Sequence, residues 1–351
     1  VQTGTVDAGE GHAVFAVGDH YSLAINHEGL TRARDIELDG GDGLVKVAGT
    51  LDATSDDVGG RVHVLGDRVG LFDATVDASG DAGGGEIRIG GDRRGEGALS
   101  TSSRTVVDAL SVLRADARES GDGGSVVVWS DEATVMAGRL SARGGVHGGD
   151  GGFAEISSLG LLRSEGAVDL GARLGEAGTL LFDPQDILIQ GGSADSADDS
   201  DASADQLTGD GGVLGSILVG DVGDGIEPFE IYESEIEGTD ANIVLEARNS
   251  ITTNGAFTNE VEGEGVGVLV VTEGNNLSFR TENATGDDVG SANAPGIDLG
   301  NLAIRTSGGG DVALITGRSG DDVAADIVVG DIDTSGADGD DGVTAGTINL
   351  E

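Results

Sequence analysis

The sequence predicts an all-β fold, a parallel β-helix (β-solenoid) with about 25 residues per rung. Glycine accounts for 65 of the 351 residues, against a usual share of about 7%. Aromatic residues make up only 3%, so valine, isoleucine, leucine and alanine have to fill the interior in thin layers. The third observation is a recurring pattern of short strand, glycine- and aspartate-rich turn, and alternating strand.

This pattern occurs in TLDATSDDVGGRVHVLG (50–66), TVDASGDAGGGEIRIGG (75–91), LRADARESGDGGSVVVWSD (113–131), LSARGGVHGGDGGFAEISS (140–158), AVDLGARLGEAGTLLFD (167–183) and DIDTSGADGDDGVTAGTINLE (331–351). First-strand markers are spaced 25, 37, 27 and 28 residues apart, at Leu51, Val76, Leu113, Leu140 and Val168. Second-strand markers are spaced 25, 39, 28 and 26 residues apart, at Val62, Ile87, Val126, Ala154 and Leu180. Because the two series run in parallel, each copy is predicted to form one rung that stacks on the next.

Within the second strands, apolar residues alternate with polar ones, as in Val62-His63-Val64, Ile87-Arg88-Ile89 and Ile348-Asn349-Leu350. The apolar members are predicted to point inward. Glycine is expected at the corners, where the chain turns sharply and neighbouring rungs approach closely. An antiparallel sandwich would use two-residue hairpin turns, whereas the turns here are long and uneven. The run at 104–120 fits either a helix or two strands, Thr105–Val107 and Leu110–Leu113, and strands are favoured.

The chain is predicted to have three parts. Residues 1–190 form the β-helix shaft, and 191–212 (GGSADSADDSDASADQLTGDGG) form an acidic low-complexity insertion or hinge that lacks apolar residues to bury. Residues 213–351 are expected to continue the rungs, with spacings of 26 residues from Val244 to Val270 and 25 residues from Leu302 to Ile327.

The formal net charge of −45 excludes nucleic acid as an expected partner, because a polyanion repels it. The acidic residues are spread along the chain, which fits either a secreted protein with a solvated surface or a protein adapted to high salt. There is no cysteine, so disulfides and thiolate metal sites are excluded. No apolar run approaches the roughly 18 residues of a membrane span, and no signal peptide opens the sequence.

Several of these segments resemble the shaft of filamentous-haemagglutinin-like exoproteins, the secreted partners of two-partner secretion systems. The resemblance is carried by GGEIRIGGDRRGEG (84–97), ADARESGDGGSVVVWSDEATVMAGRLSARGG (115–145), GGDGGFAEISS (148–158) and GTLLFDPQDILIQGG (178–192). It covers about residues 25–192 and continues more loosely over FEIYESEIEGTDANIVLEARNSITTNG (229–255).

The resemblance implies a right-handed β-helix, export through an outer-membrane transporter, location in the medium or on the cell surface, and adhesion to surface glycans or proteins. The secretion domain of such proteins carries Asn-Pro-Asn motifs. None of the three prolines here, Pro184, Pro228 and Pro295, lies in such a motif. The transporter is therefore expected to recognise a domain that this sequence does not contain.

Candidate metal ligands are Asp338, Asp340 and Asp341 in SGADGDDGV (335–343), a turn rich in oxygen donors that could suit Ca²⁺. Solvated turn carboxylates are the alternative. The EF-hand pattern is absent, and GGDGGF (148–153) has phenylalanine where a calcium β-roll needs aspartate. No other cofactor and no catalytic residue is predicted.

The histidines, namely His12, His20, His27, His63 and His147, are predicted to be exposed or in turns, with His63 pointing outward from its strand. Trp129 is expected to shield a neighbouring loop, with stacking on a sugar as the alternative. Arg88, Asp92, Arg93 and Arg94 form the densest basic neighbourhood, interpreted as an exposed turn without the aromatic subsites of a sugar-cleaving enzyme.

The predicted function is that of a secreted or cell-surface adhesin or structural exoprotein, a stiff acidic shaft without enzymatic activity. One alternative is a β-helical enzyme that cleaves polysaccharides with paired carboxylates. Another is an extracellular filament subunit, in which open strand edges associate end to end.

Overall fold

The computed structural model describes residues 1–17, 23–192, 228–258, 267–271, 274–281, 296–306, 308–316, 327–335 and 346–351. The described residues up to Leu180 form one compact unit, and those from Leu181 onward form a second. Both units are built from short parallel strands, which confirms the predicted all-β parallel β-helix. Within the described residues no helix is long and apolar enough to span a membrane.

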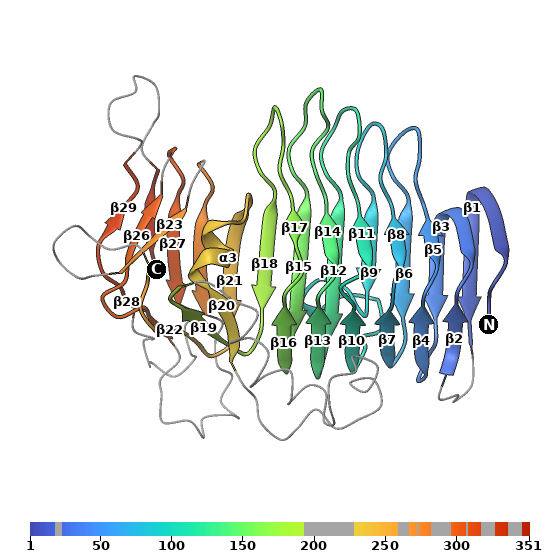
Figure 1. Cartoon of the computed structure of the whole chain (residues 1–351), viewed down its shortest axis with the longest axis horizontal. Coiled ribbons are helices and arrows are strands. Elements are labelled where there is room, and N and C mark those ends of the chain that lie inside the picture. The colour runs from blue at the N-terminus through green and yellow to red at the C-terminus, as the bar shows by residue number, and fades with distance from the viewer. Residues whose placement is uncertain are drawn as a thin grey trace. The chain divides into compact units, whose positions relative to one another are not determined.

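Each coil of the first unit contributes strands to three parallel sheets (Figure 1). Sheet 1 contains β2 (Leu23–His27), β4 (Leu44–Val47), β7 (Arg68–Leu71), β10 (Arg104–Val107), β13 (Ala133–Met136) and β16 (Leu161–Ser164). Sheet 2 contains β5 (Thr50–Asp52), β8 (Thr75–Asp77), β11 (Val112–Arg114), β14 (Arg139–Ser141) and β17 (Val168–Asp169). Sheet 3 contains β6 (Arg61–Leu65), β9 (Glu86–Ile89), β12 (Ser125–Ser130) and β15 (Phe153–Ser158).

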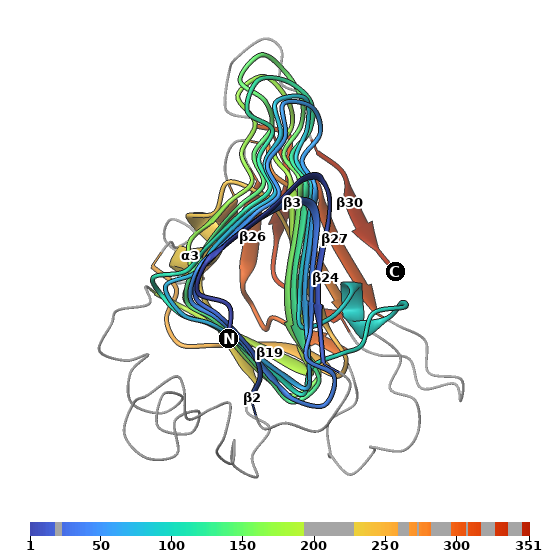
Figure 2. The ribbon, with the colours of Figure 1, turned by 90° about the vertical axis from the view of Figure 1, so that its right-hand side faces the viewer.

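The first coils use longer strands, β1 (Thr5–Ala16) and β3 (Leu30–Asp39). The start of β3 pairs with β5 in sheet 2, and its end pairs with β6 in sheet 3. Figure 2 views this unit from its N-terminal end, and the chain runs clockwise from sheet 1 through sheet 2 to sheet 3 as it recedes from the viewer. The coil is therefore right-handed.

The strand register confirms the spacing predicted for the first unit. The first-strand markers are paired in sequence, from Leu51 with Val76 through to Leu140 with Val168. The second-strand markers from Val62 to Ala154 pair in the same way. Most of these side chains are fully buried, and each buried aliphatic side chain contributes about 1.5–3 kcal/mol to stability. The run at 104–120 forms two strands, β10 and β11, as favoured from the sequence, although the second begins at Val112 and leaves Leu110 68% exposed.

Between sheets 2 and 3, each coil projects a loop, and the loops stack on one another (Figure 2). We call this stack the fin; its loops are residues 53–60, 78–85, 115–124, 142–152 and 170–178. The base of each loop is closed by a backbone hydrogen bond, for example from Gly124 N–H to the Ala115 carbonyl at 2.7 Å. A Cβ at Gly124 would lie 2.1 Å from the Gly85 carbonyl oxygen of the preceding coil. The glycine doublet is thus needed because coils approach backbone to backbone at the base of the fin.

The second unit begins around β18 (Thr179–Asp183), at the boundary between the units, and contains three further sets of parallel strands. One set is β20 (Phe229–Tyr232), β19 (Asp186–Gln190), β22 (Ser250–Asn254), β25 (Gly296–Asp298) and β28 (Ile327–Val328). A second is β21 (Asn242–Ala247), β24 (Leu277–Thr281), β27 (Val312–Thr316) and β30 (Ile348–Leu350). The third is β23 (Val268–Val271), β26 (Ala303–Thr306) and β29 (Ile332–Asp333).

The spacing predicted for this half is wrong. Ile243, Leu277, Val312 and Ile348 stack in register, so a coil here takes 34, 35 and 36 residues. Val244 pairs with Ser278 rather than Val270, which lies in a different sheet. Ile348 and Leu350, predicted to point into a core, are 47% and 56% exposed.

The second unit also departs from simple stacking in sequence order. Strand β20 follows β19 in the chain but pairs with the edge of β19 opposite to β22. The short helix α3 (Glu233–Glu237) comes directly after it, and its buried Glu233 accepts the backbone N–H groups of Gly192 and Thr258. Of the predicted insertion at 191–212, only Gly191 and Gly192 are within the described residues.

Candidate functional site

The candidate site is the outer face of sheet 3, where polar side chains of adjacent strands come into line. Alternate residues of these strands point away from the core. One row, in strand order, is His12, Asp35, Arg61 and Glu86. The neighbouring row is Val14, Glu37, His63, Arg88, Val127 and Glu155.

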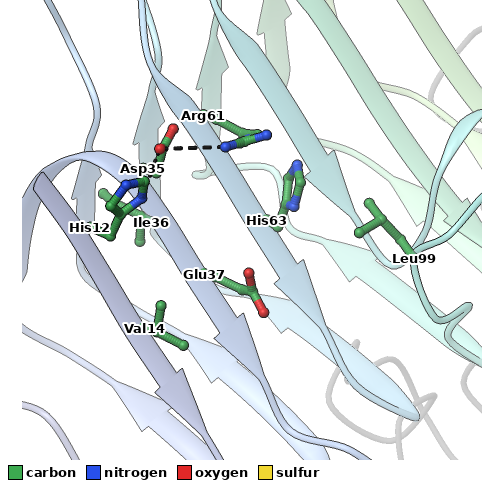
Figure 3. A pocket seen from close by; sticks show the side chains of 8 residues that line it. All are labelled: His12, Val14, Asp35, Ile36, Glu37, Arg61, His63 and Leu99. Carbon is green, nitrogen blue, oxygen red and sulfur yellow. Dashed lines mark ion pairs between the residues drawn. The ribbon is translucent and has the colours of Figure 1, made fainter.

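Opposite charges alternate across the first strands of this face. Asp35 accepts from His12 Nδ1 at 2.8 Å and lies 3.4 Å from Arg61 Nη2 (Figure 3). Glu86 contacts His63 Nε2 at 2.9 Å and Arg88 Nη2 at 3.1 Å. The pairs between neighbouring strands, together with the Glu86–Arg88 pair within β9, fix these side chains in place on a protein that carries a large negative charge.

A groove of about 230 Å³ lies over this part of the sheet (Figure 3). Its lining residues are His12, Val14, Asp35, Ile36, Glu37, Arg61, His63 and Leu99. Imidazole, carboxylate and guanidinium groups can all bond to hydroxyl groups of a polar ligand. Val14 and Leu99 add apolar surface, so the groove could contact both faces of an amphipathic ligand such as a sugar.

One imidazole in the groove is held by an ionised carboxylate. The hydrogen bond from His63, together with the charges of Arg88, His63 and Arg61, keeps the pKa of Glu86 below its ordinary value. Glu86 therefore stays charged near neutral pH and fixes the orientation of the His63 ring. The His63 side chain points outward, as predicted, but is only 12% exposed.

The other part of the outer face is covered. The segment between β9 and β10 is long, and we call residues 91–101 the flap. It contains a short 3₁₀ turn, η1 (Arg93–Gly95), capped by the Asp92 carboxylate. Beneath it lies Trp129, which is fully buried. A Cβ at Gly91 or Gly95 would lie 2.8 or 2.5 Å from the Trp129 ring, so both positions need glycine.

The flap also covers a buried acid. Glu155 has no exposed surface, and its Oε1 accepts the backbone N–H of Arg94 at 2.8 Å. Burial raises the pKa of Glu155 to about 7, while the Arg94 N–H, the Arg93 and Arg94 charges and the Ser157 hydroxyl oppose the rise. Beside it, the Arg93 guanidinium lies 4.4 Å from the centre of the Phe153 ring.

Two predictions about this face can now be assessed. Trp129 does shield a neighbouring loop: it lies under the flap and donates from Nε1 to Asp131 at 3.2 Å. The interpretation of the Arg88–Arg94 neighbourhood as an exposed turn holds for Arg93, which is exposed, and is wrong for Arg88. Arg88 is 11% exposed because it bonds to Glu86, Asp92 and Ser125, and Arg93 packs on Phe153.

The predicted exposure of the histidines holds for His12 and His147 and is wrong for His27. The His27 ring lies in the core, 2.9 Å from the Thr31 hydroxyl and edge-on to Phe15. It is buried because β2 places it on the inward side of sheet 1, and this burial lowers its pKa. His20 lies outside the described residues.

The candidate calcium ligands Asp338, Asp340 and Asp341 also lie outside the described residues. In the part of the chain that is described, no cluster of three acidic or histidine side chains could hold a metal ion. Acids in the fin bind backbone instead: Asp122 accepts the N–H of Asp150, and Asp150 accepts the N–H of Glu176.

Glu155 was not singled out from the sequence. Alternation places it between Ala154 and Ile156 on the outer face of the strand, where acidic side chains are usually solvated. Two signals could have found it: the apolar Val127 beside it, and the 39-residue step from Ile87 to Val126, which leaves chain available to cover the face.

A comparison with protein-family models and with curated proteins found no match to this chain.

Proposed function

We propose that the chain is part of the shaft of a secreted or cell-surface adhesin, a stiff acidic rod that mediates attachment. The observation that carries this proposal is the unbroken pairing of coils along sheet 1, from β2 to β16. Such ladders resist bending because every strand is hydrogen-bonded to its neighbours over its full length.

Two features support an extracellular role. The surface carries a formal charge of −45, which keeps a long repetitive β-protein soluble. The glycine-doublet coils at 84–97, 115–145 and 148–158 carry the resemblance to two-partner secretion exoproteins. On this proposal, an outer-membrane transporter exports the protein by recognising a domain that is not in this sequence.

The contact surface in this proposal is the groove on sheet 3, with glycans or proteins of another surface as its ligands. Its hydrogen-bonding side chains are held in place by the pairs between His12, Asp35 and Arg61 and between His63 and Glu86. Preorganised polar groups reduce the entropy lost on binding.

The test is an attachment assay with beads coated by the full 351-residue chain. We expect saturable attachment to cells or to glycan-coated surfaces, reduced by the double variant Arg61→Ala with His63→Ala. Beads coated with an unrelated protein of similar net charge serve as the control for charge alone. Attachment no stronger than that control would contradict the adhesin proposal. Electron microscopy of the same material separates rods of fixed length from fibres that grow with concentration, the result expected of a filament subunit.

The groove also favours a second candidate, a β-helical enzyme that cleaves polysaccharides. Asp35 and Glu37 supply two carboxylates on one strand, and His63 supplies an imidazole oriented by Glu86. Such groups can act as general acid and base. Release of reducing ends from a polysaccharide panel, lost in Glu37→Gln, would favour this candidate over the adhesin.

A further inference from the structure

The flap is anchored at both ends. Gly90 N–H donates to the Val64 carbonyl at 2.9 Å, and the buried Ser102 hydroxyl donates to the Gly66 carbonyl at 2.6 Å. Between these anchors, Arg94 adopts the left-handed φ of 57°, a strained conformation for a non-glycine residue. The closed flap therefore holds a strained backbone that opening would release.

Polar contacts and one stacking contact hold the middle of the flap against sheet 3. Arg94 N–H donates to Glu155 at 2.8 Å, and Arg93 packs on Phe153. Asp92 reaches Arg88 at 3.3 Å, and Thr101 donates to Asp131 at 2.7 Å near the far anchor. None of the three residues of η1 is buried, so burial of its own side chains contributes little.

The surroundings of Glu155 decide its charge state. Arg93 and Arg94 face it from the flap, and Ser157 faces it from its own strand. On β12, its register partner is the apolar Val127. The next strand carries Arg88, which is engaged by Glu86 and Asp92. The interactions with Arg93, Arg94 and Ser157 favour ionised Glu155, but burial outweighs them and raises its pKa to about 7. The closed flap therefore favours the neutral form of Glu155.

We propose that the flap is a pH-operated cover, which opens as Glu155 ionises and uncovers Trp129 and Phe153. Opening hydrates the carboxylate, so the open form titrates near the ordinary pKa of 4.5 and the closed form near 7. The closed form is thus most strongly favoured below pH 4.5. The equilibrium constant for opening rises between pH 4.5 and 7 and is constant above pH 7. Between its low-pH and high-pH limits the opening equilibrium rises by about 300-fold, the equivalent of 2.5 pKa steps.

This cover goes beyond the proposed function and bears on it. Leu99 of the flap lines the groove, so opening removes one groove wall while it adds two aromatic rings to the same face. The face offered to a ligand would then differ between acidic and neutral surroundings.

The experiment is hydrogen exchange of the Trp129 indole N–H, the single tryptophan of the chain, measured between pH 4.5 and 8 and corrected for intrinsic rates. The Arg94 amide is followed as a second reporter. We expect protection of both groups to fall by about 150-fold in the wild type between pH 4.5 and 8, because at pH 4.5 half of the open form is already ionised. In Glu155→Gln, a neutral side chain of the same shape, we expect protection that does not change with pH. Glu119→Gln, at an exposed acid of the fin, should behave as the wild type.

Two results would overturn the proposal. One is protection of Trp129 and Arg94 that is independent of pH in the wild type, or equally dependent in Glu155→Gln. The other is an equal loss of protection at core amides such as Val126, because the change would then be global unfolding and not opening of the flap.

Discussion

The two units differ in how regularly glycine occurs where successive coils meet. In the first unit the bases of the fin loops approach backbone to backbone, and a Cβ at Gly85, Gly124 or Gly152 would lie 2.1 Å from a carbonyl oxygen of the preceding coil. In the second unit a Cβ at Gly310 or Gly346 would likewise lie 2.1 or 2.0 Å from a carbonyl oxygen of the preceding coil, and a ladder of side chains also runs between coils. Asn242 accepts the Asn276 N–H at 2.8 Å, Asn276 accepts the Asp311 N–H at 2.7 Å, and Asp311 accepts the Thr347 N–H at 2.6 Å.

Coils of the same kind can therefore be joined by close backbone approach at glycine, by side-chain oxygens, or by both. Glycine is required where two main chains come together. The ladder requires a side-chain oxygen that reaches the N–H of the next coil, as Asp122 and Asp150 also do in the fin.

Gly124→Ala is expected to destabilise the first unit by about 3 kcal/mol or more, because the new methyl group meets backbone atoms that cannot rotate away. Urea unfolding followed by Trp129 fluorescence measures the change. Gly4→Ala is the matched control, since a Cβ there meets nothing within 4 Å, and its effect should stay within about 0.5 kcal/mol. Equal stability of the two variants would show that the doublet is not required by close approach.

Asn276→Ala is expected to destabilise the second unit by about 1–2 kcal/mol, because the Asp311 N–H loses its acceptor. Asn276→Asp keeps an acceptor oxygen and should retain most of the stability. Thermal unfolding by circular dichroism and exchange of the Asp311 amide are the measurements. Asn301→Ala, at an exposed position, is the control. If Asn301→Ala lowered the stability as much as Asn276→Ala, the loss in Asn276→Ala could not be attributed to the ladder.

The smallest effect is expected for the exposed ion pair between Arg118 and Asp81 in the fin, whose Nε and Oδ1 atoms lie 2.6 Å apart. A double-mutant cycle with Arg118→Ala and Asp81→Ala should give a coupling of about 0.2–1 kcal/mol that declines with added salt. A coupling that stays constant in high salt would mean that the fin depends on this pair more than its exposure suggests.

The sequence predicted the fold of the first unit in detail because a glycine doublet marks the same point of four successive coils, at 59–60, 84–85, 123–124 and 151–152. Leu51, Val76, Leu113 and Leu140 could be aligned from these doublets, and they stack as expected. In the second unit the residues directly before the ladder are Ala241, Asn275, Gly310 and Gly346, so no fixed motif marks the coil. A search for a 25-residue period then matched strands of different sheets.

The candidate site was less predictable. Alternation placed His63 and Arg88 on the outer face correctly, and the shielding role of Trp129 followed from its position. The burial of Glu155 depends on how the flap folds back over β12 and β15. That path is set by left-handed residues and by packing on an aromatic ring, which strand periodicity does not encode.

The backbone hydrogen bond at the base of each fin loop fixes the path of the coil, whatever residues stand at the tip of the loop. Peptides grafted at the tips between Asp56 and Val58, or between Val146 and Gly148, would be displayed in a row about 4.8 Å apart per coil, without altering the strands below. Recognition sequences could then be exchanged one coil at a time at regularly spaced positions along the shaft.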